Sequence, residues 1–462
     1  MLAKFKKKYI GDWDFYQKYL LLAIPMILQN AITNLVSFLD NIMVGQLGTE
    51  QMSGVAIVNQ LIFVYNLAIF GAVSAASIFG AQYFGKGNHK GHMYSFRFKL
   101  YATLLVTGGA ILLFLTKGSA LISLYLTDTV GNGATDLALQ YGLEYLAIMM
   151  VGLIPFAVNQ SYATNIKETG QTFIPMLASF VAVGTNAILD YLMIFGIGPF
   201  PELGVQGAAL ATVIARYIEA LIVVIWAHIH RGKNRYLEGA YTGFGIPLAE
   251  LKAILIKGFP LMMNEVLWAA GMTTVTQCYS VRGLNVVAGL NIASTITNLF
   301  NIVYLQLGSC ISIVVGQYLG AGKLEDAKDA DNKMIVFSVF CCVIMAVLMF
   351  VVGGFFPGIY NTTEEIRELA TSFIAVSAII MPFCAFSHAS YFTLRSGGKT
   401  VVTFLFDSVF TWVIVVPAAY LLAHFTGLGI VSIYFLVQGT ELIKVIIGYL
   451  MVKSNVWVVQ MV

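Results

Sequence analysis

Seven acidic residues lie within long apolar stretches of this 462-residue sequence: Asp40, Glu144, Asp190, Glu219, Glu265, Asp407 and Glu441. A carboxylate at the centre of a membrane helix costs about 2.5–3.5 kcal/mol on insertion scales, so a retained one is a candidate functional group. Desolvation raises the affinity of a carboxylate for a proton, and oxygen-rich surroundings allow the carboxylate to bind a small cation. The chemistry expected of these residues is proton or cation exchange.

Asp40 has the most polar surroundings of the seven. Polar side chains precede it at helical spacing: Gln29, Asn30, Thr33, Asn34 and Ser37. On a helix these residues form a polar face that lipid would not tolerate, so the face must contact protein or a water-filled cavity. Pro25 lies on the same helix and lacks a backbone donor, which permits a bend.

Asn186 and Asp190 lie one helical turn apart on a second span, and Thr212 on the next span is expected at a similar depth. With Asp40 they predict a coupling site of two carboxylates, an amide and a hydroxyl, which holds Na⁺ or shares a proton. The alternative is a polar cluster that only packs helices together.

A substrate cavity is the second predicted site. Its candidates combine amides with carboxylate and aromatic side chains: Gln29, Asn30, Asn34, Ser37, Asn59, Asn66, Asn264, Glu265, Trp268 and Asn291. Such side chains suit flat, cationic ligands. Ordinary helix contacts remain the alternative for most of them. Lys444 follows Glu441 by three residues, which predicts neutralisation within one helix.

The composition identifies the environment of these helices. Hydrophobic residues make up 58% of the chain and charged residues only 11%, against roughly 25% charged in soluble domains. About 20 apolar residues cross the hydrocarbon core. The apolar runs predict an all-α polytopic membrane protein with twelve spans, near 19–44, 54–80, 98–116, 137–160, 172–198, 204–228, 253–280, 286–316, 334–356, 368–392, 401–424 and 428–452.

The distribution of Lys and Arg predicts the orientation of these spans. They gather at the basic N-terminal segment and in the even-numbered loops, whereas the odd-numbered loops hold only Lys117, Arg282 and Arg367. Cytoplasmic loops retain basic residues. Both termini are therefore expected in the cytoplasm, in a multi-pass protein of the cytoplasmic membrane.

The two halves of the chain repeat each other. An offset of 235 takes Pro25 to Pro260, Gly48 to Gly283, and the segment AQYFGKGN (81–88) to GQYLGAGK (316–323). Six helices per half give both halves the same orientation, related by a pseudo-two-fold axis along the membrane normal. We expect an N-lobe over 1–228, a cytoplasmic linker over 229–252 and a C-lobe over 253–462.

Several function classes are excluded or disfavoured. A net charge of +3 does not support nucleic-acid binding. SGGKT (396–400) would need a glycine at Thr393 to form a phosphate-binding loop. No cofactor and no metal other than Na⁺ at Asp40 and Asp190 is expected, so the energy must come from an ion gradient.

Several segments together resemble the multidrug and toxic compound extrusion (MATE) family. They are IPMILQNAITNLVSFLDNIMVGQLG (24–48), GAQYFGKGN (80–88), NAILDYLMIFG (186–196) and GVQGAALAT (204–212). The resemblance implies an antiporter that exports organic cations by alternating access and is driven by H⁺ or Na⁺. The family's coupling residues fall on Asp40, Asn186, Asp190 and Thr212, and its bending proline on Pro25.

The C-lobe departs from part of that family. Some members place a carboxylate in the tenth helix, where this chain has Cys384, and Glu265 stands one turn earlier than their glutamate. This favours the DinF-like branch, in which coupling runs through Asp40. The expected partners are small organic cations and membrane lipids, with no nucleic acid, and the protein is expected to be a monomer.

Two other functions compete with drug export. A flippase for lipid-linked precursors would need a cationic cavity for phosphates, and Arg216 is the only arginine expected at mid-membrane. A membrane-embedded enzyme would need a nucleophile–base set or a metal cluster, and the sequence offers neither.

Overall fold

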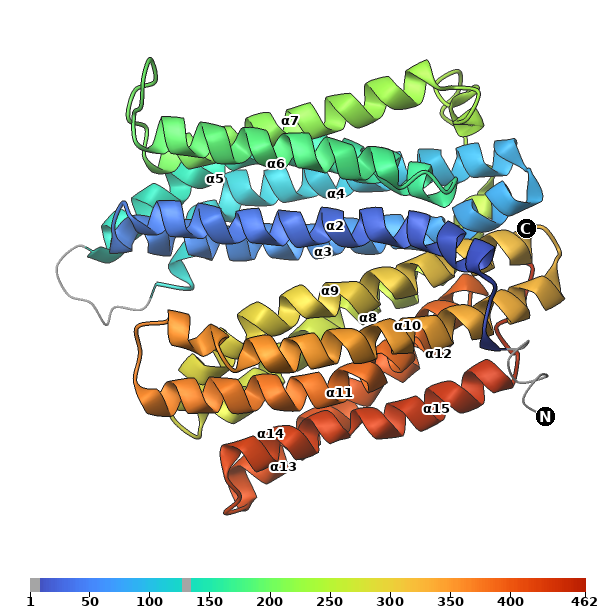
Figure 1. The fold of residues 1–462 in the computed structure, drawn as a ribbon. Coiled ribbons are helices and arrows are strands. Elements are labelled where there is room, and N and C mark those ends of the chain that lie inside the picture. Colours follow the sequence, from blue (N-terminus) through green and yellow to red (C-terminus); the bar gives the residue numbers. More distant parts are fainter. Residues whose placement is uncertain (1–8, 127–133) are drawn as a thin grey trace. The chain divides into compact units, whose positions relative to one another are not determined.

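The computed structural model describes residues 9–126 and 134–462, so the basic segment at 1–8 lies outside the described residues. Within this part of the chain, twelve helices are long and apolar enough to cross a membrane (Figure 1). The twelve predicted spans are confirmed. Several helices extend beyond the apolar runs, as at His89 and Leu324, where polar residues add further turns.

The first six spans are α2 (Trp13–Gly45), α3 (Thr49–Lys86), α4 (His89–Ser123), α5 (Ala134–Glu168), α6 (Phe173–Ile194) and α7 (Val205–Ile229). A 3₁₀ turn, η1 (Arg235–Leu237), precedes α8 (Leu248–Ser280), α9 (Leu284–Gly320), α10 (Leu324–Gly353), the turn η2 (Phe356–Ile359) and α11 (Glu364–Ser396). The eleventh span joins α12 (Thr400–Phe404), two π-helical turns η3 (Leu405–Val409) and η4 (Thr411–Val415), and α13 (Val416–Phe425). The twelfth comprises α14 (Ile430–Gly439) and α15 (Glu441–Lys453).

The repeat is preserved in the backbone where α3 and α9 end. Gly87 and Gly322 adopt φ values of +74° and +73°, a left-handed conformation in which glycine carries no steric penalty. The following residues donate equivalent hydrogen bonds, Asn88 N–H to the Tyr83 carbonyl at 2.9 Å and Lys323 N–H to the Tyr318 carbonyl at 3.0 Å. All of these positions differ by 235, so the sequence repeat is a structural repeat.

Residue contacts divide the chain into two compact units. The amino-terminal unit contains 24–80 and 89–252, and the carboxy-terminal unit contains 253–462 together with 9–23 and 81–88. The first turns of α2 and the last turn of α3 thus pack with the carboxy-terminal unit, and both helices pass from one unit to the other. The two lobes predicted from the sequence repeat, 1–228 and 253–462, stay a prediction.

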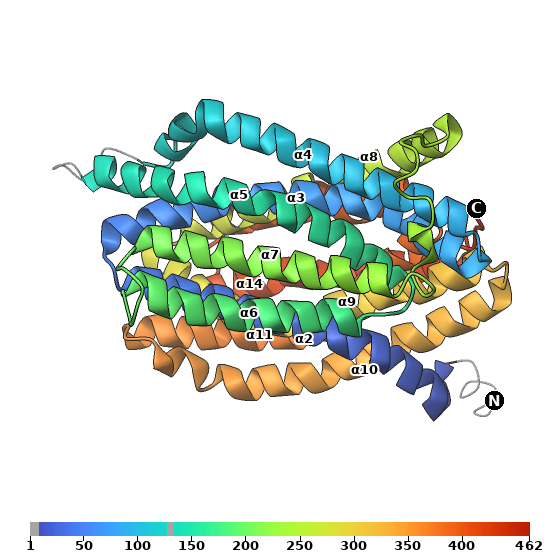
Figure 2. The ribbon, with the colours of Figure 1, turned by 90° about the horizontal axis from the view of Figure 1, so that it is seen from above.

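The amino-terminal unit is built around α5, which packs against α4 and α7, while α6 lies along α7 (Figure 2). Its main core contains Val58, Tyr65, Tyr145, Leu153 and Ala209 among others. A second cluster includes Phe96, Tyr162, Tyr236 and Leu237, so the predicted linker packs onto this unit.

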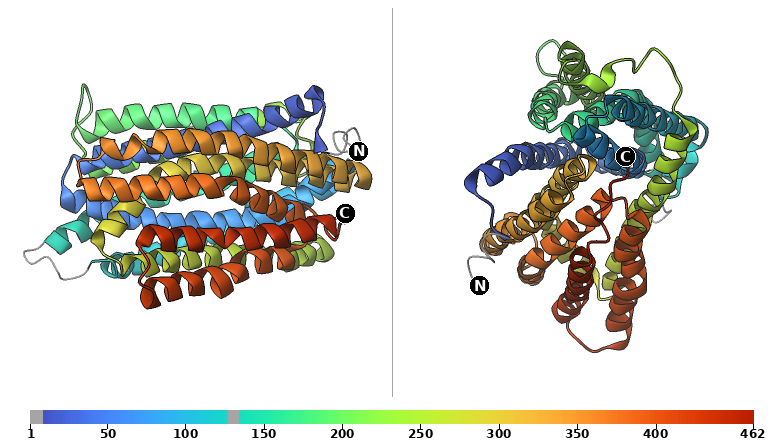
Figure 3. Two further views of the ribbon diagram at one scale, coloured as in Figure 1. Left: turned by 60° about the horizontal axis from the view of Figure 1, so that its bottom comes forward. Right: turned by 90° about the vertical axis from the view of Figure 1, so that its right-hand side faces the viewer.

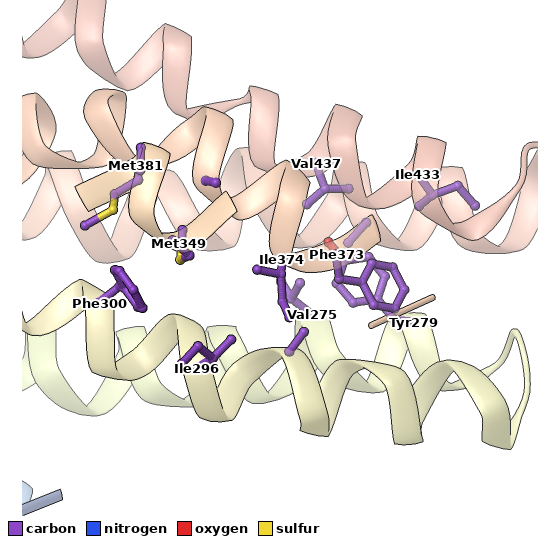
Figure 4. Close-up of a cluster of buried hydrophobic side chains, with 14 of the residues drawn as sticks. Val275, Tyr279, Ile296, Phe300, Met349, Phe373, Ile374, Met381, Ile433 and Val437 are labelled. Atoms are coloured by element: carbon purple, nitrogen blue, oxygen red, sulfur yellow. The ribbon is translucent and has the colours of Figure 1, made fainter. Parts of the chain in front are cut away.

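In the carboxy-terminal unit, α9, α10 and α11 pack against one another, and α14 and α15 pack on α11 (Figure 3). Their shared core places Phe373 and Tyr279 at one end and Met349, Met381 and Phe300 at the other (Figure 4). These buried apolar faces hold the helices that carry the polar residues described below.

The last turn of α3 crosses α9 at a pair of glycines within this unit. A Cβ atom at Gly85 would overlap the carbonyl group of Gln317, and one at Gly320 would overlap the carbonyl group of Gln82. The side chain of Gln82 is fully buried and donates to the Ser396 carbonyl at 2.9 Å. The two backbones approach this closely because neither glycine has a side chain.

Candidate ion-coupling site

Asp40 of α2 and Asp190 of α6 are brought together in the amino-terminal unit. Asp190 is fully buried, Asp40 is half-buried, and the two carboxyl groups lie close enough to interact directly. Neither oxygen of Asp190 accepts a hydrogen bond of normal geometry from the described residues. Two carboxylates this close repel each other unless a proton or a cation lies between them.

Asn186 and Thr212 complete the predicted set. The Asn186 amide donates to the Thr212 hydroxyl at 3.4 Å, and that hydroxyl donates to the Ala208 carbonyl at 3.0 Å. Asn186 is 5% exposed. The four predicted coupling residues therefore come from α2, α6 and α7 and supply only oxygen and amide groups, which are the ligands of hard cations.

Tyr145 of α5 is a member of this site that the sequence does not indicate. It is 5% exposed, its hydroxyl donates to the Asn59 side chain at 3.3 Å, and Asp40, Asp190 and Arg216 all act on it electrostatically. A tyrosine in an apolar run is typical of ordinary packing, so the sequence alone does not place Tyr145 near the two carboxyl groups. It is bonded to Asn59 and lies within electrostatic range of both carboxyl groups.

Arg216 and Glu219 of α7 have separate partners. Arg216 donates to the Gly152 carbonyl at 3.4 Å and lies over the Phe156 ring at 5.2 Å. Glu219 accepts a hydrogen bond from the Ser179 hydroxyl. The same hydroxyl accepts a hydrogen bond from the Gln29 amide at 2.7 Å, so Gln29 belongs to a polar chain across α2, α6 and α7.

Three other polar residues of this face of α2 bond within their own helix. Asn30, Asn34 and Ser37 donate to carbonyl groups four residues earlier, at 2.8–3.0 Å. Asn34 and Ser37 are exposed. Pro25 is buried inside α2, one residue beyond the boundary between the two units.

The candidates for the substrate cavity fall in both units. Asn59 and Asn66 belong to the amino-terminal unit and are half-buried. Asn264, Glu265, Trp268 and Asn291 belong to the carboxy-terminal unit, where Asn264 is buried and Asn291 is exposed. Their common role in a cavity stays a prediction.

The expected pairing of Lys444 with Glu441 is wrong. Lys444 donates to Asp407 at 2.6 Å, and Asn264 donates to the other oxygen of Asp407 at 3.0 Å. The i,i+3 spacing allowed a local pair, but the π-helical turn η3 brings Asp407 to α15 from 37 residues away. Sequence spacing carries no signal for such a contact.

Within the described residues, twelve helices long and apolar enough to span a membrane, with two interacting carboxyl groups on α2 and α6, are typical of a polytopic membrane transporter. The sequence model of the family described as MatE matches residues 25–192 and 260–421, in both halves. The chain belongs to the MATE family and is a transporter, not an enzyme. The predicted family and fold class are thereby confirmed.

Relatives and solved structures agree with this assignment. The chain is 23% identical over 413 residues to "Probable multidrug resistance protein NorM" of Thermotoga maritima, covering 89% of this chain and 86% of the relative. Its fold matches that of an outward-facing multidrug resistance MATE family transporter of the MOP superfamily, with a TM-score of 0.85, 20% identity and 96% coverage of each chain. A MOP superfamily transporter from Pyrococcus furiosus matches with the same values.

Proposed function

We propose that this protein is an antiporter that exports small organic cations and is driven by H⁺ or Na⁺ exchange at Asp40 and Asp190. The observation that carries the proposal is the interaction between these two carboxyl groups, of which Asp190 is fully buried and Asp40 half-buried. Asn186 and Thr212, which bond to each other, and Tyr145, which acts on the pair electrostatically, are the further polar groups of the proposed site.

Coupling requires that the ion and the substrate stabilise different conformations. An unoccupied carboxylate pair repels itself, and a bound proton or Na⁺ removes that repulsion. Occupancy of Asp40 and Asp190 therefore changes which arrangement of their helices is stable. Alternating access follows if the substrate favours the arrangement that the ion disfavours.

The Asp40→Asn substitution tests the site. We expect drug-resistance export to fall to the level of cells without the transporter, because an amide can neither release a proton nor supply a charged ligand. Asp329→Asn is the matched control, since Asp329 is 51% exposed and pairs with Lys333 on the surface. Full export by a folded Asp40→Asn protein would contradict the proposal.

The coupling ion is identified with purified protein in proteoliposomes. An imposed pH gradient and, separately, an imposed Na⁺ gradient are applied while uptake of an organic cation is followed. Drive by one gradient, lost in the Asp40→Asn protein, supports coupling at this site and assigns the ion. Drive by neither, with translocation of a lipid-linked oligosaccharide, would instead support a flippase.

We also propose that the protein is a monomer in the cytoplasmic membrane, surrounded by lipid, with both termini in the cytoplasm. We further propose that the protein belongs to the DinF-like branch, in which coupling runs through Asp40. A single cysteine at the exposed position Lys233 should react with an impermeant thiol reagent only in inside-out vesicles.

A further inference from the structure

Asp407 and Lys444 form a buried ion pair in the carboxy-terminal unit, away from the predicted coupling site. Their side chains are 15% and 8% exposed, and the ammonium nitrogen lies 2.6 Å from the carboxylate. Charges buried to this degree require excellent geometry and further hydrogen bonds to offset their desolvation. The surroundings of the pair supply both.

The carboxylate is held from its second side. Ser408 donates to the Asn264 side-chain oxygen at 2.8 Å, which turns the amide nitrogen of Asn264 toward Asp407 at 3.0 Å. Asn264 is 2% exposed. Asn264 therefore fixes the position of Asp407 independently of the cation that binds its other oxygen.

Two aromatic rings surround the cation. The Lys444 nitrogen lies 5.4 Å from the centre of the Phe406 ring and 6.0 Å from that of Phe410, and both rings are buried. These phenylalanines flank Asp407 in the irregular segment around η3, where π-helical geometry changes the direction of side chains. A carboxylate with aromatic rings is the chemistry that recognises an organic ammonium group.

We propose that Asp407, Phe406 and Phe410 form an ammonium-binding site that Lys444 occupies in this conformation, and that the ammonium group of a transported substrate displaces Lys444. The proposal rests on the proposed export of organic cations. Lys444 acts as a tethered competitor, because its side chain presents an ammonium group at high effective concentration.

The position of the site suits this role. Asp407 lies seven residues into the eleventh span, about 10 Å along the helix, and Lys444 lies nine residues before the end of the twelfth, about 14 Å. Both lie toward the predicted cytoplasmic side, from which an exported cation enters. Glu441, Cys384, His388 and Glu265 are other titratable groups that interact electrostatically with the pair.

The first experiment removes the tethered ammonium group. The purified Lys444→Ala protein is titrated with n-butylammonium, and equilibrium binding is measured in detergent. We expect saturable binding at least tenfold tighter than in the unmodified protein, and loss of that gain in the Asp407→Asn/Lys444→Ala double variant. Lys453→Ala is the control, because Lys453 is exposed and its nitrogen lies over the Tyr449 ring rather than beside Asp407. Equal binding by the single and double variants would overturn the proposal.

The second experiment uses the protein without any substitution, so its result does not depend on the folding of a variant. An amine-reactive reagent labels the lysines with and without tetramethylammonium, and mass spectrometry quantifies each site. Displacement should increase labelling of Lys444 several-fold and leave Lys453 unchanged. Unchanged labelling of Lys444 would overturn displacement. Neither experiment measures antiport, so failure at Asp40 would leave both results intact.

Discussion

Single glycines set the distance between helices at the crossing of α3 and α9. Gly85 and Gly320 each meet a backbone carbonyl group that a side chain would strike. The obstacle is backbone rather than a flexible side chain, so the surrounding structure cannot yield at small cost.

Gly85→Ala is expected to destabilise the protein by about 1–3 kcal/mol, the usual range for overpacking. Gly108→Ala is the matched control, because Gly108 lies inside α4 with open space around it, and alanine favours a helix. Thermal unfolding in detergent should show a lower midpoint for Gly85→Ala only. Equal midpoints would mean that the crossing is not tightly packed.

The segment that joins the two halves behaves as an element of the amino-terminal unit. Arg97 of α4 donates to three of its carbonyl groups, those of Gly239, Ala240 and Gly245, at 2.6, 2.9 and 2.7 Å. Tyr236 packs nearby at 1% exposure. These bonds hold the segment to α4 as far as Gly245, with only Ile246 and Pro247 between Gly245 and the start of α8.

Arg97→Lys keeps the charge but lacks the planar fork that serves three carbonyl groups at once. Loss of a charge-assisted hydrogen bond costs about 1.5–3 kcal/mol, so local opening should become at least about tenfold more frequent. Hydrogen exchange of residues 239–247 should accelerate accordingly, with α5 unchanged. Lys233→Ala, an exposed change in the same segment, should leave exchange at 239–247 unaltered.

At the scale of the whole molecule, α2, α3 and α8 each contain residues of both units. The boundary in α2 falls between Ala23 and Ile24, next to Pro25, the boundary in α3 falls after Gly80, and α8 enters the carboxy-terminal unit at Ala253. Proline and glycine are the residues at which helices bend most readily. In α2 and α3 such a residue stands at the boundary, so these are the positions at which we expect the two helices to bend.

Pro25→Ala restores a backbone donor and stiffens α2, since proline is about 3 kcal/mol less favourable than alanine inside a helix. We expect thermal stability to be maintained while the rate of export falls several-fold. Pro260→Ala is the matched control, because Pro260 is the repeat partner but lies seven residues beyond Ala253, where α8 enters the carboxy-terminal unit. Similar rates in both variants would show that bending of α2 is not required.

The sequence predicted the twelve spans and the meeting of Asp40 with Asp190, because hydrophobic length and intramembrane carboxylates are strong local signals. It did not predict Tyr145, whose role depends on how α5 packs in the amino-terminal unit. It also assigned Lys444 to the wrong acid, because a π-helical turn shifts the register of Asp407 in a way that no spacing rule anticipates. Local patterns predict elements, while contacts between elements depend on packing.

The glycine crossing has a symmetry of its own. Gly85 meets Gln317 while Gly320 meets Gln82, so each contact is the image of the other under the shift of 235 residues. Reciprocal contacts of this kind are what an isologous interface between two identical chains produces. The crossing therefore has the self-complementary geometry of a dimer interface, built within a single chain, so equivalent substitutions at Gly85 and Gly320 should act alike.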